Sequence, residues 1–121
     1  MSRAIAGTIV IVDWRGGAMP KKPNRSRPAI VVEDHPLFDD DYPNILVVPL
    51  TDDRLLAIPW LSVTIKPSAD NGYGSTCYAL SQSVTAVSKQ RVKVTESRIT
   101  GDQLLDIRRG IAEAIGSPSG A

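Results

Sequence analysis

The feature that most constrains the fold is a short apolar run that follows directly on the charged stretch Arg25–Pro28. Pro28 fixes its own φ angle and pushes the preceding residue, Arg27, towards an extended backbone. The next four residues, Ala29–Val32, are apolar and largely β-branched, which is typical of a strand buried on both faces. Arg27 therefore stands at the entrance of a rigid strand, where a cation is well placed to meet a phosphate. Taken alone, this stretch favours an ordinary arginine at a strand edge.

A second apolar run, Asn44–Leu50, ends at a hydroxyl residue, Thr51. Pro49 cannot donate a hydrogen bond to a neighbouring strand, so it indicates a strand edge or a bulge. Thr51 is followed by two aspartates, which we interpret as the start of a loop. Two strands that end in Arg27 and Thr51 would offer one pocket a cation and a hydroxyl donor.

Charge is unevenly distributed, although the 121-residue chain has a net charge of only +1. Every charged residue between Trp14 and Val32 is basic, and every one from Glu33 to Asp53 is acidic. The basic segment either attracts an anion or is a solvated loop with no partner. The length fits one domain with a single modest core.

The cysteine and histidine counts argue against a disulfide and against a metal site. Cys77 and His35 are each the only residue of their type, which is too few for a zinc site, and we expect no metal and no cofactor. No apolar segment approaches the ~20 residues that cross a bilayer. The run Thr8–Val12 is too short for a signal peptide. We therefore expect a cytoplasmic protein with no membrane partner.

Most of the chain reads as short strands separated by turns and loops. The predicted strands are Thr8–Val12, Arg27–Glu33, Asn44–Leu50, Trp60–Ile65, Thr76–Leu80, Ser83–Ser88 and Val92–Val94. A loop is expected at Arg15–Ser26, one turn of helix at Leu37–Asp41, and a hairpin turn at Asn71-Gly72.

The pattern changes to a helical period near the end of the chain. Thr100–Gln103 has the form of a capping box, and apolar residues follow at helical spacing up to Ile115. Gly116 is placed to end the helix, so we expect one domain over residues 1–116 and a disordered tail at 117–121. The element order predicts a mainly β fold, a small and strongly bent antiparallel sheet or barrel whose open side is covered by a C-terminal helix.

Four segments carry a family resemblance. Gly7–Trp14 fits a G-x-I-x-x-V-D-W-like opening strand, Arg27–Val32 fits R-P-A-x-V-V, and Val48–Thr51 is V-P-L-T. Leu80–Val92 is similar to an S-Q-x-x-T-x-x-K-x-R-L segment. In this order the segments resemble the MazF/PemK family of toxin ribonucleases from bacterial toxin–antitoxin pairs. The resemblance extends from Gly7 to Gly116.

The resemblance implies an SH3-like barrel that forms a homodimer, cleaves single-stranded RNA such as mRNA at short sequences, and is silenced by a cognate antitoxin. The family's active-site arginine falls on Arg27, and its active-site threonine falls on Thr51. The family loop often carries a glutamate shortly before the arginine. Here that region, Met19–Pro23, contains no acid, so a role for that glutamate does not carry over.

Further residues are candidates for binding RNA. Lys21, Lys22 and Arg25 would hold flanking phosphates, and Ser81 and Gln82 either line the site or make hydrogen bonds at a corner of the barrel. RNA supplies its own nucleophile, the 2′-hydroxyl group, so such an enzyme needs only to position the strand and to stabilise developing charge. This chemistry requires no metal.

Two other functions remain open at this point. The same fold superfamily includes CcdB, a gyrase-poisoning toxin whose function depends on a Trp-Gly-Ile ending, whereas this sequence ends Pro118–Ala121 without an aromatic residue. The other alternative is a toxin-fold binding module that has lost catalysis together with the loop glutamate.

Overall fold

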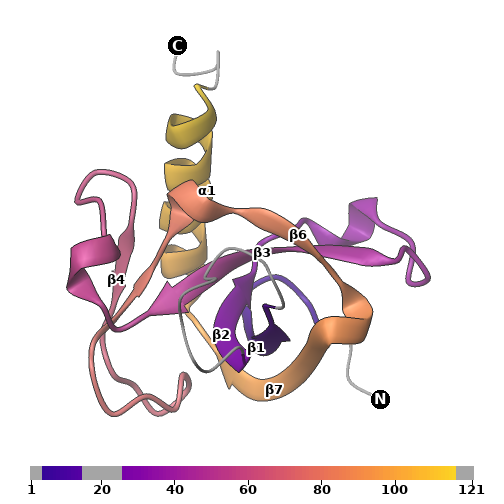
Figure 1. Ribbon diagram of the computed structural model, residues 1–121, viewed down its shortest axis with the longest axis horizontal. Helices are drawn as coiled ribbons and strands as arrows, with labels where there is room; N and C mark the ends of the chain where they lie inside the picture. Colours follow the sequence, from indigo (N-terminus) through magenta and orange to yellow (C-terminus); the bar gives the residue numbers. More distant parts are fainter. Residues whose placement is uncertain (1–3, 15–25, 117–121) are drawn as a thin grey trace.

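The computed structural model describes residues 4–14 and 26–116 (Figure 1). The strands are β1 Thr8–Asp13, β2 Ser26–Val31, β3 Asn44–Thr51, β4 Val63–Ile65, β5 Cys77–Ala79, β6 Thr85–Ser88 and β7 Val92–Arg98. Within these two ranges the structure has one α-helix, α1 Gly101–Ile115, and four single turns of 3-10 helix, η1 His35–Leu37, η2 Arg54–Leu56, η3 Ser81–Ser83 and η4 Lys89–Arg91. The predicted loop, apart from Ser26, and the predicted tail lie outside the described residues.

The strands pair antiparallel in the order β4-β5-β3-β2-β1-β7, and β6 pairs with the first half of β3. One edge of β3 therefore contacts β2, while its other edge contacts first β6 and then β5. In Figure 1, β6 and β7 pass on opposite sides of β1 and β2, so the sheet is strongly bent. No pairing between β6 and β7 closes the described part of the sheet. The predicted mainly β fold with a C-terminal helix is confirmed, as an open sheet rather than a closed barrel.

The central strands are buried on both faces, as the run Ala29–Val32 predicts. Alternate residues of β1, β2 and β3 point to two different cores. One core lies under the helix and contains Ile9, Ile30, Val48 and Ile107. The other fills the concave side of the bent sheet and contains Val10, Val12, Trp14, Ala29, Val31, Ile45 and Val47.

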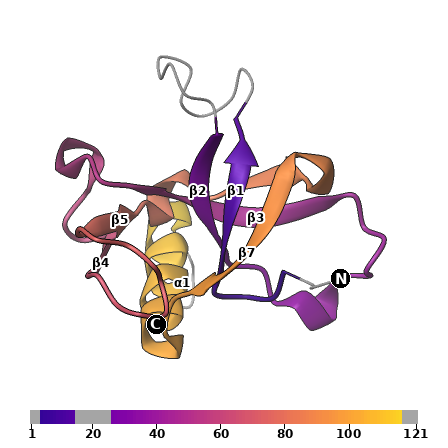
Figure 2. The ribbon, with the colours of Figure 1, turned by 90° about the horizontal axis from the view of Figure 1, so that it is seen from below.

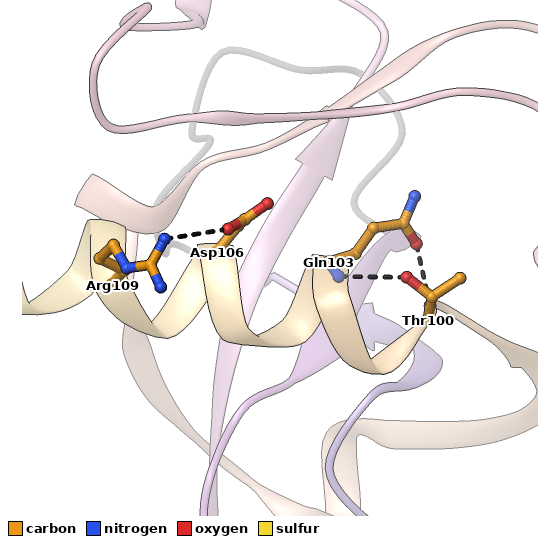
Figure 3. A network of polar contacts seen from close by, with 4 residues as sticks. All are labelled: Thr100, Gln103, Asp106 and Arg109. Carbon is orange, nitrogen blue, oxygen red and sulfur yellow. Dashed lines mark hydrogen bonds and ion pairs between the residues drawn. The ribbon is translucent and has the colours of Figure 1, made fainter.

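The capping box at the start of α1 is confirmed (Figure 3). The Gln103 backbone N–H donates to Thr100 Oγ1 at 3.1 Å, and the Thr100 N–H donates to Gln103 Oε1 at 2.9 Å. One turn further on, Arg109 and Asp106 form an exposed ion pair at 3.4 Å. Gly116 ends the helix with a left-handed φ of 73°, also as predicted.

The helix lies beside β4 and is held closely against the rest of the fold (Figure 2). Arg108 donates from Nε to the Val32 carbonyl oxygen at 3.1 Å and from Nη2 to that of Glu33 at 3.2 Å. Gly110 is in contact with η3, since a Cβ atom at this position would lie 2.8 Å from Ser81 Oγ and 2.4 Å from the Leu61 carbonyl oxygen. The missing side chain therefore allows η3 and the segment before β4 to touch the helix backbone.

Some predicted elements differ from the structure. The predicted strand Trp60–Ile65 is a strand only from Val63, because Leu61 and Ser62 both donate their N–H groups to the Ile58 carbonyl oxygen, at 2.9 and 2.7 Å, and form a turn. Trp60 is consequently 78 % exposed.

The expected hairpin is present, since β4 and β5 pair antiparallel, but Asn71-Gly72 does not form a tight two-residue turn between them. These residues lie within a longer connection between β4 and β5. The buried Asn71 side chain organises this connection by accepting hydrogen bonds from Ser68 N and Tyr73 N, at 3.1 and 3.0 Å. A buried amide that is satisfied in this way replaces the tight turn.

Smaller differences concern boundaries. The single helical turn expected at Leu37–Asp41 lies at His35–Leu37, and the strand expected at Val92–Val94 continues to Arg98. Among the described residues, no helix is long and apolar enough to span a membrane.

Candidate functional site

Arg27 and Thr51 come from neighbouring strands that run antiparallel. The pairing of β2 with β3 includes Val31 with Val47, Ile30 with Val48 and Ala29 with Pro49. This pairing ends at Ala29 and Pro49, two residues before Arg27 and Thr51, and Thr51 pairs with β5 on the other edge of β3. Arg27 and Thr51 therefore lie at the same end of two adjacent antiparallel strands, and their meeting in one pocket stays a prediction.

Each of the two residues is paired with a further strand of the sheet. Arg27 is paired with Val12 of β1, and Thr51 is paired with Tyr78 of β5. By strand alternation, both share the sheet face of Ala29 and Val47, which is the face of the concave core. They therefore stand at the end of that core, on rigid strands, which is where a preorganised site is most precise.

The hydroxyl of Thr51 has a defined hydrogen-bonding state. Thr51 is 5 % exposed, and its Oγ1 accepts the Asp53 N–H at 3.1 Å. A hydroxyl carries one hydrogen and two lone pairs, so the proton of Thr51 stays available for a second partner. This Thr-x-Asp turn was missed by the sequence analysis, although Thr51-Asp52-Asp53 is a recognisable pattern for a side chain that bonds the backbone two residues on.

A cavity of about 330 Å³ lies between the end of β1 and β6. It is lined by Asp13, Trp14, Thr85, Ala86, Val87, Ser88 and Arg91. Asp13 pairs with Ser26, the residue before Arg27, so the cavity adjoins the strand end that carries Arg27. Another groove, of about 600 Å³, lies between α1 and residues 59–64, and neither Arg27 nor Thr51 lines either hollow.

Gln82 makes hydrogen bonds within the fold, whereas the buried Ser81 Oγ has no hydrogen-bond partner among the described residues. Ser81 is 0 % exposed and packs on the helix at Gly110, on the opposite side of the sheet from the concave core. Gln82 hydrogen-bonds to Ser62 and to the Leu56 backbone, so it contacts the segment between β3 and β4. The structure therefore does not bring Ser81 together with Arg27 and Thr51, and it links Gln82 to Thr51 only through that segment.

The other predicted RNA-binding residues, Lys21, Lys22 and Arg25, lie outside the described residues. Cys77, near Thr51 on the neighbouring strand, is buried. Burial, and secondly the charge of Asp52, raise the pKa of the Cys77 thiol, which keeps it protonated and poorly nucleophilic. Within residues 4–14 and 26–116, His, Cys, Asp and Glu side chains form no group of three that could hold a metal ion.

Comparison with solved structures identifies the fold. MazF from Deinococcus radiodurans superposes with a TM-score of 0.72 and 19 % identity, covering 96 % of this chain and 99 % of that one. An endoribonuclease from a mycobacterial species, in complex with its cognate antitoxin, has a TM-score of 0.70 and 18 % identity, with 96 % and 98 % covered. Toxin MazF-mt6 from Mycobacterium tuberculosis has a TM-score of 0.69 and 14 % identity, with 90 % and 96 % covered.

At these identities the structural likeness establishes the fold alone. A search of curated protein sequences finds no significant match. The sequence profile of the PemK-like, MazF-like toxins of type II toxin–antitoxin systems matches residues 5–115, nearly the whole chain. This match agrees with the segments that carry the resemblance in the sequence. The chain therefore belongs to the PemK-like, MazF-like family of type II toxins.

Proposed function

We propose that this protein is a toxin endoribonuclease that cleaves single-stranded RNA without a metal ion, using Arg27 and Thr51. The observation that supports the proposal is that Arg27 and Thr51 lie on two adjacent antiparallel strands, β2 and β3. Family membership supports it, as do similar structures described as endoribonucleases. Growth inhibition follows from the cleavage of cellular mRNA.

The reaction needs little covalent chemistry from the protein. The 2′-hydroxyl oxygen attacks the adjacent phosphorus and loses its proton to solvent, and the bond from phosphorus to the 5′-oxygen breaks. The leaving oxygen takes up a proton, so the products carry a 2′,3′-cyclic phosphate and a 5′-hydroxyl. Arg27 donates hydrogen bonds to the phosphate oxygens as negative charge develops on them. Thr51 donates a hydrogen bond from its hydroxyl group to a phosphate oxygen. A guanidinium holds its protons too tightly to act as the acid or base.

Flanking phosphates would be held by the basic segment before β2. Lys21, Lys22 and Arg25 supply three charges there. Neutralising phosphates releases counterions, so RNA affinity should fall as salt rises. Replacing both Lys21 and Lys22 with alanine should weaken RNA binding and flatten its salt dependence, with little effect on the cleavage rate of bound RNA.

The same proposal includes two protein partners. We expect a homodimer with two-fold symmetry and a cognate antitoxin, since similar structures include an endoribonuclease bound to its cognate antitoxin and a MazE–MazF complex. An acidic antitoxin segment over Arg15–Arg27 would compete with RNA. Light scattering that gives a monomer mass at micromolar concentration would contradict the dimer. An antitoxin affinity that does not change with salt would contradict the electrostatic competition.

The experiment that tests the activity uses a labelled single-stranded RNA and a matched RNA in which every 2′-hydroxyl is replaced by hydrogen. We expect the first to be cut equally with and without EDTA, and the second to stay intact. Cleavage that EDTA abolishes would contradict the metal-free reaction. An intact RNA in both conditions would support a binding module or a CcdB-like inhibitor, which a gyrase assay then separates.

A further inference from the structure

The side-chain amide of Gln82 makes hydrogen bonds to the segment between β3 and β4 through both its oxygen and its nitrogen. Its Oε1 accepts the Ser62 hydroxyl at 2.9 Å, and its Nε2 donates to the Leu56 carbonyl oxygen at 3.2 Å. Ser62 Oγ in turn accepts the Ile58 N–H at 2.9 Å. Because a carbonyl oxygen can only accept, the nitrogen of the Gln82 amide must face Leu56.

The contact with Leu56 continues to the proposed catalytic hydroxyl. Leu56 donates its N–H to the Asp53 carbonyl oxygen at 3.1 Å, and Asp53 donates its N–H to Thr51 Oγ1 at 3.1 Å. The Asp53 carboxylate also accepts the Leu55 N–H at 3.0 Å, which closes the turn η2. Three hydrogen bonds in series therefore run from Gln82 through Leu56 and Asp53 to Thr51. We call them the Gln82 relay.

The starting point of this relay is rigid. Gln82 lies in η3, whose first residue, Ser81, is fully buried against Gly110 of the helix. The residue before η3, Leu80, donates its N–H to the Pro49 carbonyl oxygen of β3 at 2.9 Å. Gln82 is thus anchored to the helix and to the strand that carries Thr51, while its side chain reaches the far part of the segment that follows Thr51.

We propose that Gln82 is a positioning residue for RNA cleavage, which fixes the Thr51 hydroxyl through Leu56 and Asp53; this rests on the proposed function. As long as Asp53 N–H occupies one lone pair of Thr51 Oγ1, the hydroxyl proton points away from Asp53 and towards a partner. Without Gln82, η2 loses its tertiary hydrogen bond, and Thr51 is held less firmly. The rate of the chemical step then falls, while the affinity for RNA does not change.

The test is a kinetic comparison of wild type, Gln82→Ala, Thr51→Val and the double variant. We expect Gln82→Ala to lower kcat by roughly ten- to a hundredfold with KM unchanged, since small misplacements of a reacting group cost rates of this order. The double variant should be no slower than Thr51→Val alone, because both changes act on one hydroxyl. A raised KM with an unchanged kcat would mean that Gln82 binds RNA directly. If the rate losses of Gln82→Ala and Thr51→Val multiply in the double variant, the two residues act independently and the relay is overturned.

Control variants separate positioning from general stability. Gln103→Ala removes another glutamine with backbone contacts, but at the start of α1, so it should lower stability and leave kcat unchanged. Ser62→Ala keeps the Leu56 bond and should lower kcat less than Gln82→Ala. Equal losses of kcat in Gln82→Ala and Gln103→Ala, in proportion to stability, would also overturn the proposal.

Amide hydrogen exchange tests the relay independently of activity. The Asp53 and Leu56 amides should exchange faster in Gln82→Ala than in wild type, and those of β1 should not. If wild-type protein cuts no RNA, the proposed function fails, and only hydrogen exchange can then test the Gln82 relay. Faster exchange of the Asp53 and Leu56 amides in Gln82→Ala supports the relay, and unchanged exchange overturns it. If wild type cuts and Gln82→Ala cuts at the same kcat, the relay alone fails.

Discussion

Gly110 lies where the helix contacts η3 and the segment before β4, and replacing it with alanine should destabilise the protein. A Cβ atom there would meet the Leu61 carbonyl oxygen at 2.4 Å and Ser81 Oγ at 2.8 Å. Alanine normally stabilises a helix interior by about 1 kcal/mol relative to glycine. In this helix the contact partner is backbone and cannot move away by a change of rotamer, so the helix must shift.

The size of the effect follows from two opposing contributions. Forcing a methyl group into a packed site costs about 1–3 kcal/mol, and a clash with backbone places Gly110→Ala at the upper end. Subtracting the helix preference leaves a loss of about 2 kcal/mol in the free energy of unfolding. For a domain of this size that corresponds to a fall in Tm of about 8 °C.

Thermal and urea unfolding measure this loss, with Gly101→Ala as the matched control. Gly101 lies in the first turn of the same helix, and a Cβ atom there meets nothing within 4 Å. Gly101→Ala should therefore be neutral or should stabilise by up to about 1 kcal/mol. If Gly110→Ala is as stable as wild type, the close contact between α1 and η3 is refuted.

Three further results are expected. Thr100→Ala removes the cap of α1 and should cost about 1 kcal/mol in urea unfolding; an unchanged midpoint would argue against the capping box. Burial, and secondly the charge of Cys77, raise the pKa of Tyr73 from 10.0 to about 12, so the contribution of Tyr73 to stability is complete below pH 10 and is lost as the pH rises to 12. Tyr73→Phe should remove this loss of stability at alkaline pH. If the free energy of unfolding of the variant still falls as steeply between pH 10 and 12, the raised pKa of Tyr73 is contradicted. Burial and the charge of Asp52 raise the pKa of Cys77, so iodoacetamide should modify it faster in urea than in the native protein, and equal rates at pH 8 would contradict its burial.

The sequence was sufficient where the signal is local. Ala29–Val32 is apolar on every residue, and the strand is covered on both faces. Thr100 and Gln103 cap the helix because both halves of a capping box lie within one turn. Arg27 precedes one apolar run and Thr51 follows another, so their places on two strands were predictable, whereas the pairing of β2 with β3 depends on a register that the sequence does not specify.

Contacts between distant segments could not be predicted. Trp60–Ile65 alternates in polarity like a strand, but the turn closed by the Ile58 carbonyl oxygen occupies its first half. Gly110 has the pattern of a tolerated helix glycine, and only the packing of Leu61 and Ser81 explains it. The partners of Gln82 lie 20 and 26 residues away, so its relay to Thr51 became visible only in the structure.

The central claim is that Arg27 and Thr51 stabilise one phosphate during RNA cleavage. The most direct measurement is the single-turnover rate of RNA cleavage by wild type, Arg27→Ala, Thr51→Val and the double variant, with folding checked by circular dichroism. Arg27→Ala should be slower by on the order of a hundred- to a thousandfold, Thr51→Val should also be slower, and the double variant should be less impaired than the product of the single effects. Folded Arg27→Ala protein that cuts RNA at the wild-type rate would contradict the account.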